Sequence, residues 1–82
     1  GRGYGQAALN ELLDFGFEQL DMSAIYLYTQ ATNLKARHIY DKFSFQSMGT
    51  HYDFREGQGY VKFVDLVAWR QSWKQRNNKI TD

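Results

Sequence analysis

The spacing of the apolar residues changes along this chain, and that change constrains the fold more than any other feature. From residue 6 to residue 20 apolar side chains recur every three or four positions, which is the spacing of one helical face. Gly16 lies on this stripe, where glycine costs about 1 kcal/mol relative to alanine, so we expect a neighbouring group to pack closely against it. The stripe consists of Leu9, Leu12, Leu13, Gly16, Phe17 and Leu20.

After this helix the pattern changes to that of a strand followed by a second helix. Residues 24–30 (AIYLYTQ) are bulky on both faces, which is typical of a strand covered on two sides. Thr32 or Asn33 is a suitable N-cap for a helix over residues 34–43. The apolar face of that helix consists of Ala36, Ile39, Tyr40 and Phe43.

The remainder of the chain has the pattern of a β-hairpin with a tail. Residues 45–54 and 60–69 predict two strands, and the glycines of REGQG between them supply turn conformations. Residues 70–82 are polar, with Trp69 and Trp73 one helical turn apart, and indicate either a short terminal helix or a frayed end.

Length and composition limit the range of functions. A chain of 82 residues forms one domain with a small core. The absence of cysteine excludes disulfides and thiolate metal sites, and favours a cytoplasmic protein. Ten basic and nine acidic residues give no reason to expect a nucleic acid or a membrane as partner. No apolar run is long enough to span a bilayer, and no signal peptide is visible.

The chain opens GRGYGQAAL, with three glycines directly before a run of good helix formers. Glycines allow a close backbone approach, and the first turn of a helix favours an anion, so this stretch is either an anion site or a flexible end. A start at glycine, in the middle of a motif, also suggests a piece of a longer protein.

Several separated segments, in the right order, resemble the C-terminal half of the GNAT superfamily of acyl-CoA-dependent N-acetyltransferases. These segments are GRGYGQAAL, AIYLYTQATN, NLKARHIYDKFSF and YVKFVDLVAW. The resemblance implies an α/β (α+β) fold with about three strands in a mixed, mostly antiparallel sheet and two helices, so that residues 1–82 form a single partial domain. It also implies transfer of acetyl from acetyl-CoA, without a metal, to a primary amine of a small molecule, a polyamine or a protein N-terminus.

The resemblance also assigns roles to residues. The glycine turn and the following helix would bind the coenzyme A pyrophosphate, with Gly3 and Gly5 as the two small positions; a second register takes Arg2, Gly5 and Ala7 instead. Tyr40 would protonate the departing thiolate, although a tyrosine on an apolar stripe is commonly a core residue. Asn33 would contact the pantetheine arm, or serve only as an N-cap. The implied coenzyme-binding residues are Gly1, Arg2, Gly3, Tyr4, Gly5, Gln6, Asn33 and Ala36.

This sequence departs from the family pattern in two respects. Ser44 stands where the family usually has glycine, and it would adopt a left-handed conformation at a cost of about 1 kcal/mol. The first half of the family fold is absent from these residues, so we expect the isolated chain to be inactive. That half, or a second copy of the chain, would be needed to cover the exposed strand edge, and we expect association.

Other candidate residues have simpler explanations. His38 and His51 lack metal-ligand spacing. Lys35, Arg37 and Lys42 could reach phosphates but suit a solvated helix face, and Asp65 suits a cationic amine but also a surface strand. The alternative function is a non-catalytic interaction module that binds a protein partner or nucleic acid, and the balanced charge argues against nucleic acid.

Overall fold

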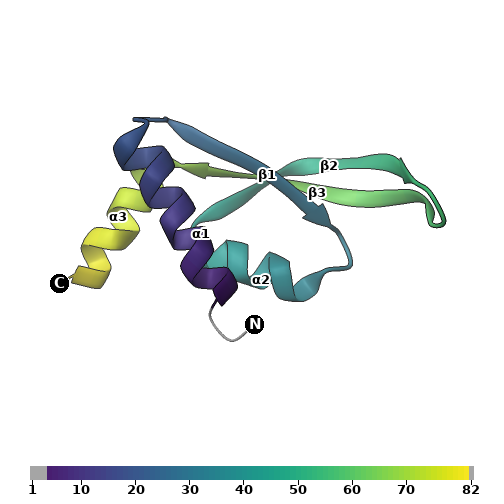
Figure 1. Ribbon diagram of the computed structural model, residues 1–82, viewed down its shortest axis with the longest axis horizontal. Coiled ribbons are helices and arrows are strands. Elements are labelled where there is room, and N and C mark those ends of the chain that lie inside the picture. Colours follow the sequence, from purple (N-terminus) through teal and green to yellow (C-terminus); the bar gives the residue numbers. More distant parts are fainter. Residues whose placement is uncertain (1–3, 82) are drawn as a thin grey trace.

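The computed structural model describes residues 4–81, and the side chains of residues 5–75 (Figure 1). Three strands form one antiparallel sheet in the order β1-β3-β2. The elements in chain order are α1 (Tyr4–Asp14), the π-helical turn η1 (Phe15–Gln19), β1 (Ala24–Gln30), α2 (Leu34–Lys42), β2 (Phe45–Arg55), β3 (Gly59–Trp69) and α3 (Arg70–Thr81). The predicted order of helix, strand, helix and hairpin is confirmed, and the tail is a third helix.

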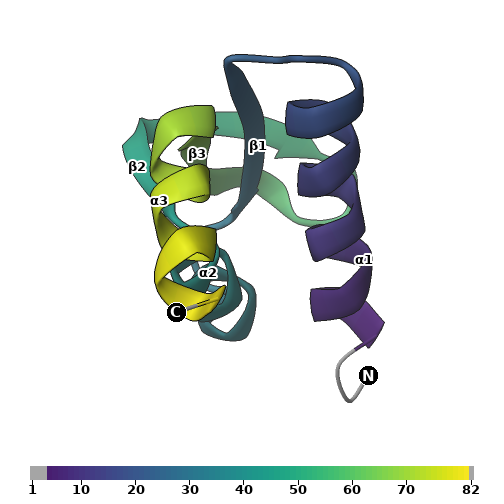
Figure 2. The same ribbon diagram turned by 90° about the vertical axis from the view of Figure 1, so that its left-hand side faces the viewer.

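The core lies between the helices and one face of the sheet. Alternate residues of the central strand, Val64, Leu66 and Ala68, face the helices, because side chains alternate along a strand. Figure 1 shows the three helices on the same side of the sheet, and Figure 2, along the long axis, shows α1 and α3 on either side of β1. The buried cluster consists of Leu9, Leu13, Phe17, Phe43, Phe45, Val64, Leu66, Ala68 and Trp73.

The first helical stripe is narrower than its spacing predicts. Leu9, Leu13 and Phe17 are buried, but Leu12 and Leu20 are 50% and 56% exposed. Leu12 borders an open hollow between α1 and α2. Leu20 follows the π-helical turn, in which its N–H donates to the carbonyl of Phe15, and this wider turn moves the residues after it off the stripe.

Gly16 is confirmed as a point of close approach. A Cβ atom at this position would lie 2.7 Å from Cδ1 of Ile25 on β1, which is closer than a van der Waals contact. The missing side chain therefore lets η1 and β1 pack directly against each other, and this contact offsets the helix-weakening effect of glycine.

The expectation that β1 is covered on both faces is wrong for the described residues. Ile25 and Leu27 pack against the core, whereas Tyr26 and Tyr28 on the other face are 61% and 53% exposed. The reason is that the helices of residues 4–81 all pack against one face, which leaves the tyrosine face open.

Both predicted ends of α2 have the expected local structure. The side-chain oxygen of Asn33 accepts a hydrogen bond from the backbone N–H of Ala36 at 3.1 Å, which is an N-cap. At the other end Ser44 has a φ of 69°, in the left-handed region that favours glycine.

Ser44→Gly is therefore expected to raise the free energy of unfolding by about 1 kcal/mol, because glycine adopts this φ without a Cβ penalty. Urea unfolding followed by circular dichroism measures the change. Ser47→Gly in β2 makes the same exchange where φ is negative, and should lower stability. A loss of stability in Ser44→Gly would contradict the strain assigned to this position.

Candidate coenzyme-binding site

A hollow of about 290 Å³ lies between the N-terminal part of α1 and the inner face of α2. Its walls are apolar, and three small residues, Gly5, Ala8 and Ala36, keep it open. Three of the predicted site residues, Gly5, Ala36 and Tyr40, therefore meet at one place. The coenzyme hollow, as we call it, is lined by Gly5, Ala8, Leu9, Leu12, Ala36, Ile39 and Tyr40.

Gly5 borders this hollow without being required by the packing of the described residues. A Cβ atom added at this position would have no described neighbour within 4 Å. Glycine weakens a helix relative to alanine, so a glycine that no contact requires is not explained by stability. The absence of a side chain keeps the backbone of α1 accessible to a bound molecule.

The start of α1 has the electrostatics of an anion site. The first turn of the helix contains no acidic residue. The first four N–H groups of a helix have no partner within it, and together with the helix dipole they favour a negative charge. The predicted residues Gly1, Arg2 and Gly3 lie outside the described residues, and Tyr4 is described only in its backbone. Gln6 is half-buried and does not line the coenzyme hollow.

The position of Tyr40 is compatible with both of its predicted roles, as a core residue and as the proton donor. Its ring is half-buried and packs edge-on against Phe45, with 5.5 Å between the ring centroids. It also lines the coenzyme hollow, and no hydrogen bond joins its hydroxyl to another described residue. The ring is thus held by the core while the residue remains accessible from the hollow.

The basic residues of α2 are used in different ways. Arg37 donates a hydrogen bond through Nη1 to the carbonyl oxygen of Ala31 at 2.8 Å, so its side chain holds the turn before α2. Lys35 and Lys42 are exposed, as is Asn33 apart from its capping bond. The N-cap role of Asn33 is confirmed, whereas its contact with a pantetheine arm stays a prediction.

The structure brings together His51 and Asp65, two residues that were not predicted to contact each other. Nδ1 of His51 lies 2.8 Å from Oδ1 of Asp65 and 3.0 Å from Oδ2, across the two strands of the hairpin. The hairpin turn predicts this pair, because pairing Arg55 with Gly59 sets His51 opposite Phe63, diagonal to Asp65 on the same face.

Within residues 4–81 no three potential metal ligands lie close enough together to form a metal site. None of the helices in this range has both the length and the apolar composition that a membrane-spanning helix needs.

Comparison with known proteins identifies the family. Residues 1–45 match the family described as the acetyltransferase (GNAT) family. Because this match covers more than half of the chain, the chain belongs to the GNAT family of acetyltransferases. The sequence resemblance is thereby confirmed, and so is the predicted fold.

Its relatives include enzymes named for polyamines. The chain is 35% identical over 49 residues to the spermidine N(1)-acetyltransferase of Vibrio cholerae, a match that covers 60% of the chain and 28% of the relative. Mutant forms of the spermidine/spermine N-acetyltransferase SpeG from Vibrio cholerae superpose with a TM-score of 0.85 and 26% identity, over 93% of this chain and 46% of that one. SpeG in complex with manganese ions also has a TM-score of 0.85 and 26% identity, over 93% and 45%. The chain spans less than half the length of these relatives.

Proposed function

We propose that this chain forms the coenzyme-binding part of an N-acetyltransferase that transfers acetyl from acetyl-CoA to a primary amine, in particular that of a polyamine. The observation that carries the proposal is the convergence of Gly5, Ala36 and Tyr40 on the coenzyme hollow. The polyamine acceptor is supported by the names of the relatives, which are spermidine and spermine acetyltransferases.

In this proposal each part of the coenzyme hollow has a physical task. The N-terminus of α1 binds the pyrophosphate through its free N–H groups, and Gly5 leaves the backbone accessible. The apolar wall between Ala36 and Ile39 excludes water from the pantetheine arm. Tyr40 donates its phenolic proton to the sulfur as the amine attacks the thioester carbonyl and the carbon–sulfur bond breaks.

The remaining groups come from a first half of the fold. The described residues supply no general base against the coenzyme hollow, since its lining is apolar apart from Tyr40. In this proposal the isolated chain is inactive, and the free edge of β1 is the place where the first half, or a second copy of the chain, associates.

Gly5→Leu tests the coenzyme hollow directly. We expect this substitution to lower the affinity for acetyl-CoA at least about tenfold, because the leucine side chain occupies the entrance that glycine keeps open. The free energy of unfolding should stay equal or rise slightly, since no described atom obstructs the new side chain and leucine is the better helix former. Titration calorimetry with acetyl-CoA and urea unfolding measure the two quantities.

The control is Asn10→Leu, on an exposed position of α1 that does not line the hollow. It should leave the affinity unchanged. Both variants are measured in the 82-residue chain and in a protein that joins it to a first half of the fold. Absence of acetyl-CoA binding in both wild-type forms would refute the proposed function, and equal affinity in Gly5→Leu and wild type would refute the assignment of the coenzyme to this hollow.

A further inference from the structure

The turn between α2 and β2 folds the chain back onto Tyr40. Ser44 has a φ of 69°, and its N–H donates to the carbonyl of Asp41 at 3.2 Å, while the N–H of Phe43 donates to the carbonyl of Tyr40 at 3.0 Å. A helix that ends on a left-handed residue commonly brings the next residue against its own last turn. In this chain that next residue is Phe45, and it contacts Tyr40.

Phe45 is a fixed support for the ring of Tyr40. It is the first residue of β2, where it pairs with Ala68 of the central strand. Its side chain is 4% exposed and belongs to the buried cluster. The two rings meet edge-on, with 5.5 Å between the centroids and 64° between the planes, which is a favoured arrangement of an aromatic pair.

The orientation of Tyr40 depends on this contact. No hydrogen bond joins its hydroxyl to another described residue, and Phe45 supplies the one ring contact that Tyr40 makes within the part of the chain that the structure describes. The torsion that turns an aromatic ring has broad minima, so packing has to set it. Tyr40 also lines the coenzyme hollow, whereas Phe45 does not.

We propose that Phe45 is a positioning residue, which holds the phenol of Tyr40 at the angle needed to protonate the sulfur of coenzyme A. This inference rests on the proposed function, in which Tyr40 is the acid. Proton transfer requires the donor within hydrogen-bond reach of the acceptor, and a misplacement of about 1 Å can lower a rate about 100-fold. Because Phe45 lies outside the lining of the coenzyme hollow, it acts through Tyr40 and not on the coenzyme.

The first test needs no coenzyme. NMR relaxation of labelled tyrosine rings in the 82-residue chain measures how tightly Tyr40 is held, and Tyr40→Phe assigns its signal. We expect a rigid ring in the wild type and a mobile one in Phe45→Leu, because leucine keeps an apolar side chain but offers no ring to pack against. Phe45→Met is the second variant, since its flexible side chain fills the space without fixing the neighbouring ring, and it should also loosen Tyr40.

Phe17→Leu is the matched control. It makes the same exchange in the same buried cluster, but the ring of Phe17 packs against Trp73 instead of Tyr40. We expect it to lower stability and to leave the ring of Tyr40 rigid. A mobile Tyr40 in the wild type, an equally rigid one in both Phe45 variants, or equal loosening in Phe17→Leu would overturn the proposal.

Kinetics test the consequence, in a protein that joins this chain to a first half of the fold. Phe45→Leu should lower kcat about tenfold and leave the KM for acetyl-CoA nearly unchanged. In a Tyr40→Phe background the same exchange should change kcat by less than about twofold, since phenylalanine has no proton to place. An equal loss of kcat in both backgrounds would make Phe45 a structural residue only and overturn the proposal. Absence of turnover in the wild type would instead refute the proposed function.

Discussion

Tyr40→Phe is expected to lower kcat by about 100- to 1000-fold, in a protein that joins this chain to a first half of the fold. General acid catalysis contributes factors of this size, and phenylalanine has no proton to give to the departing thiolate. The ring contact with Phe45 remains, so the free energy of unfolding and the affinity for acetyl-CoA should change little. Steady-state kinetics with spermidine, calorimetry and urea unfolding measure the three quantities.

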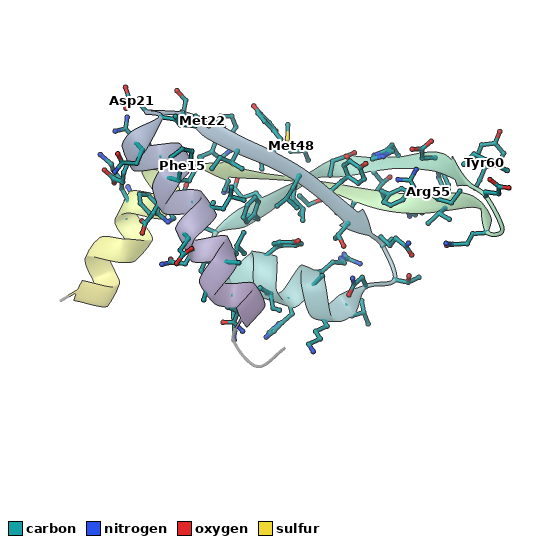
Figure 3. The ribbon with its side chains drawn as sticks, in the orientation of Figure 1. Phe15, Asp21, Met22, Met48, Arg55 and Tyr60 are labelled. Carbon is teal, nitrogen blue, oxygen red and sulfur yellow. The ribbon has the colours of Figure 1, made fainter. Side chains whose placement is uncertain are left out.

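The control for this variant is Tyr60→Phe near the hairpin tip, where the tyrosine is 76% exposed and distant in the fold from the coenzyme hollow (Figure 3). It should have wild-type kinetics. A purely structural role of Tyr40 would instead lower stability or coenzyme affinity together with kcat. A kcat within a factor of about two of wild type would exclude Tyr40 as the acid.

The sequence predicted those parts of the fold that depend on local interactions. The bounds of β1, the Asn33 cap, the left-handed Ser44 and the glycine turn of the hairpin all follow from neighbouring residues. Which face of the sheet is covered does not follow from neighbouring residues, because it depends on where the helices pack. For that reason the sequence pattern predicts that Tyr26 and Tyr28 of β1 are buried, whereas both are exposed in the structure.

The candidate site was predicted only as far as the family motif extends. Gly5, Ala36 and Tyr40 were named from the motif, and the structure adds that they line one hollow. The pair of His51 and Asp65 was missed, because the two residues are 14 positions apart in the sequence and meet only through the pairing of β2 with β3. Local propensity carries no information on such a pair, whereas counting outward from the turn does.

Two described side chains of the terminal helix α3 contact the rest of the fold: Arg70 forms an ion pair with Asp21 at 2.7 Å, and Trp73 enters the core. Trp73 is 2% exposed, and its ring lies 5.2 Å from that of Phe17 on η1. Apart from Trp73 and Ile80, α3 consists of polar residues. Among its described side chains the indole is the one that enters the core, and it favours a terminal helix over a frayed end.

Trp73→Ala is expected to lower the free energy of unfolding by about 3–5 kcal/mol, since it leaves a large cavity beside Phe17. In a small domain this is a large share of the total stability. Urea unfolding followed by circular dichroism measures the loss, and the helical signal of the native state reports whether α3 detaches.

Two further variants separate packing from the general effect of losing a tryptophan. Trp69→Ala removes a side chain that is 41% exposed and contacts Tyr26 only edge-on, so it should lower the free energy of unfolding by about 1 kcal/mol or less.

Trp73→Phe keeps most of the buried ring, and it also removes an indole N–H that has no hydrogen-bond partner among the described residues. Because a buried unpaired donor costs about 1–3 kcal/mol, its removal offsets part of the lost volume. Similar losses in Trp73→Ala and Trp69→Ala would mean that α3 is not docked through Trp73, and a loss in Trp73→Phe as large as in Trp73→Ala would mean that the indole N–H has a partner.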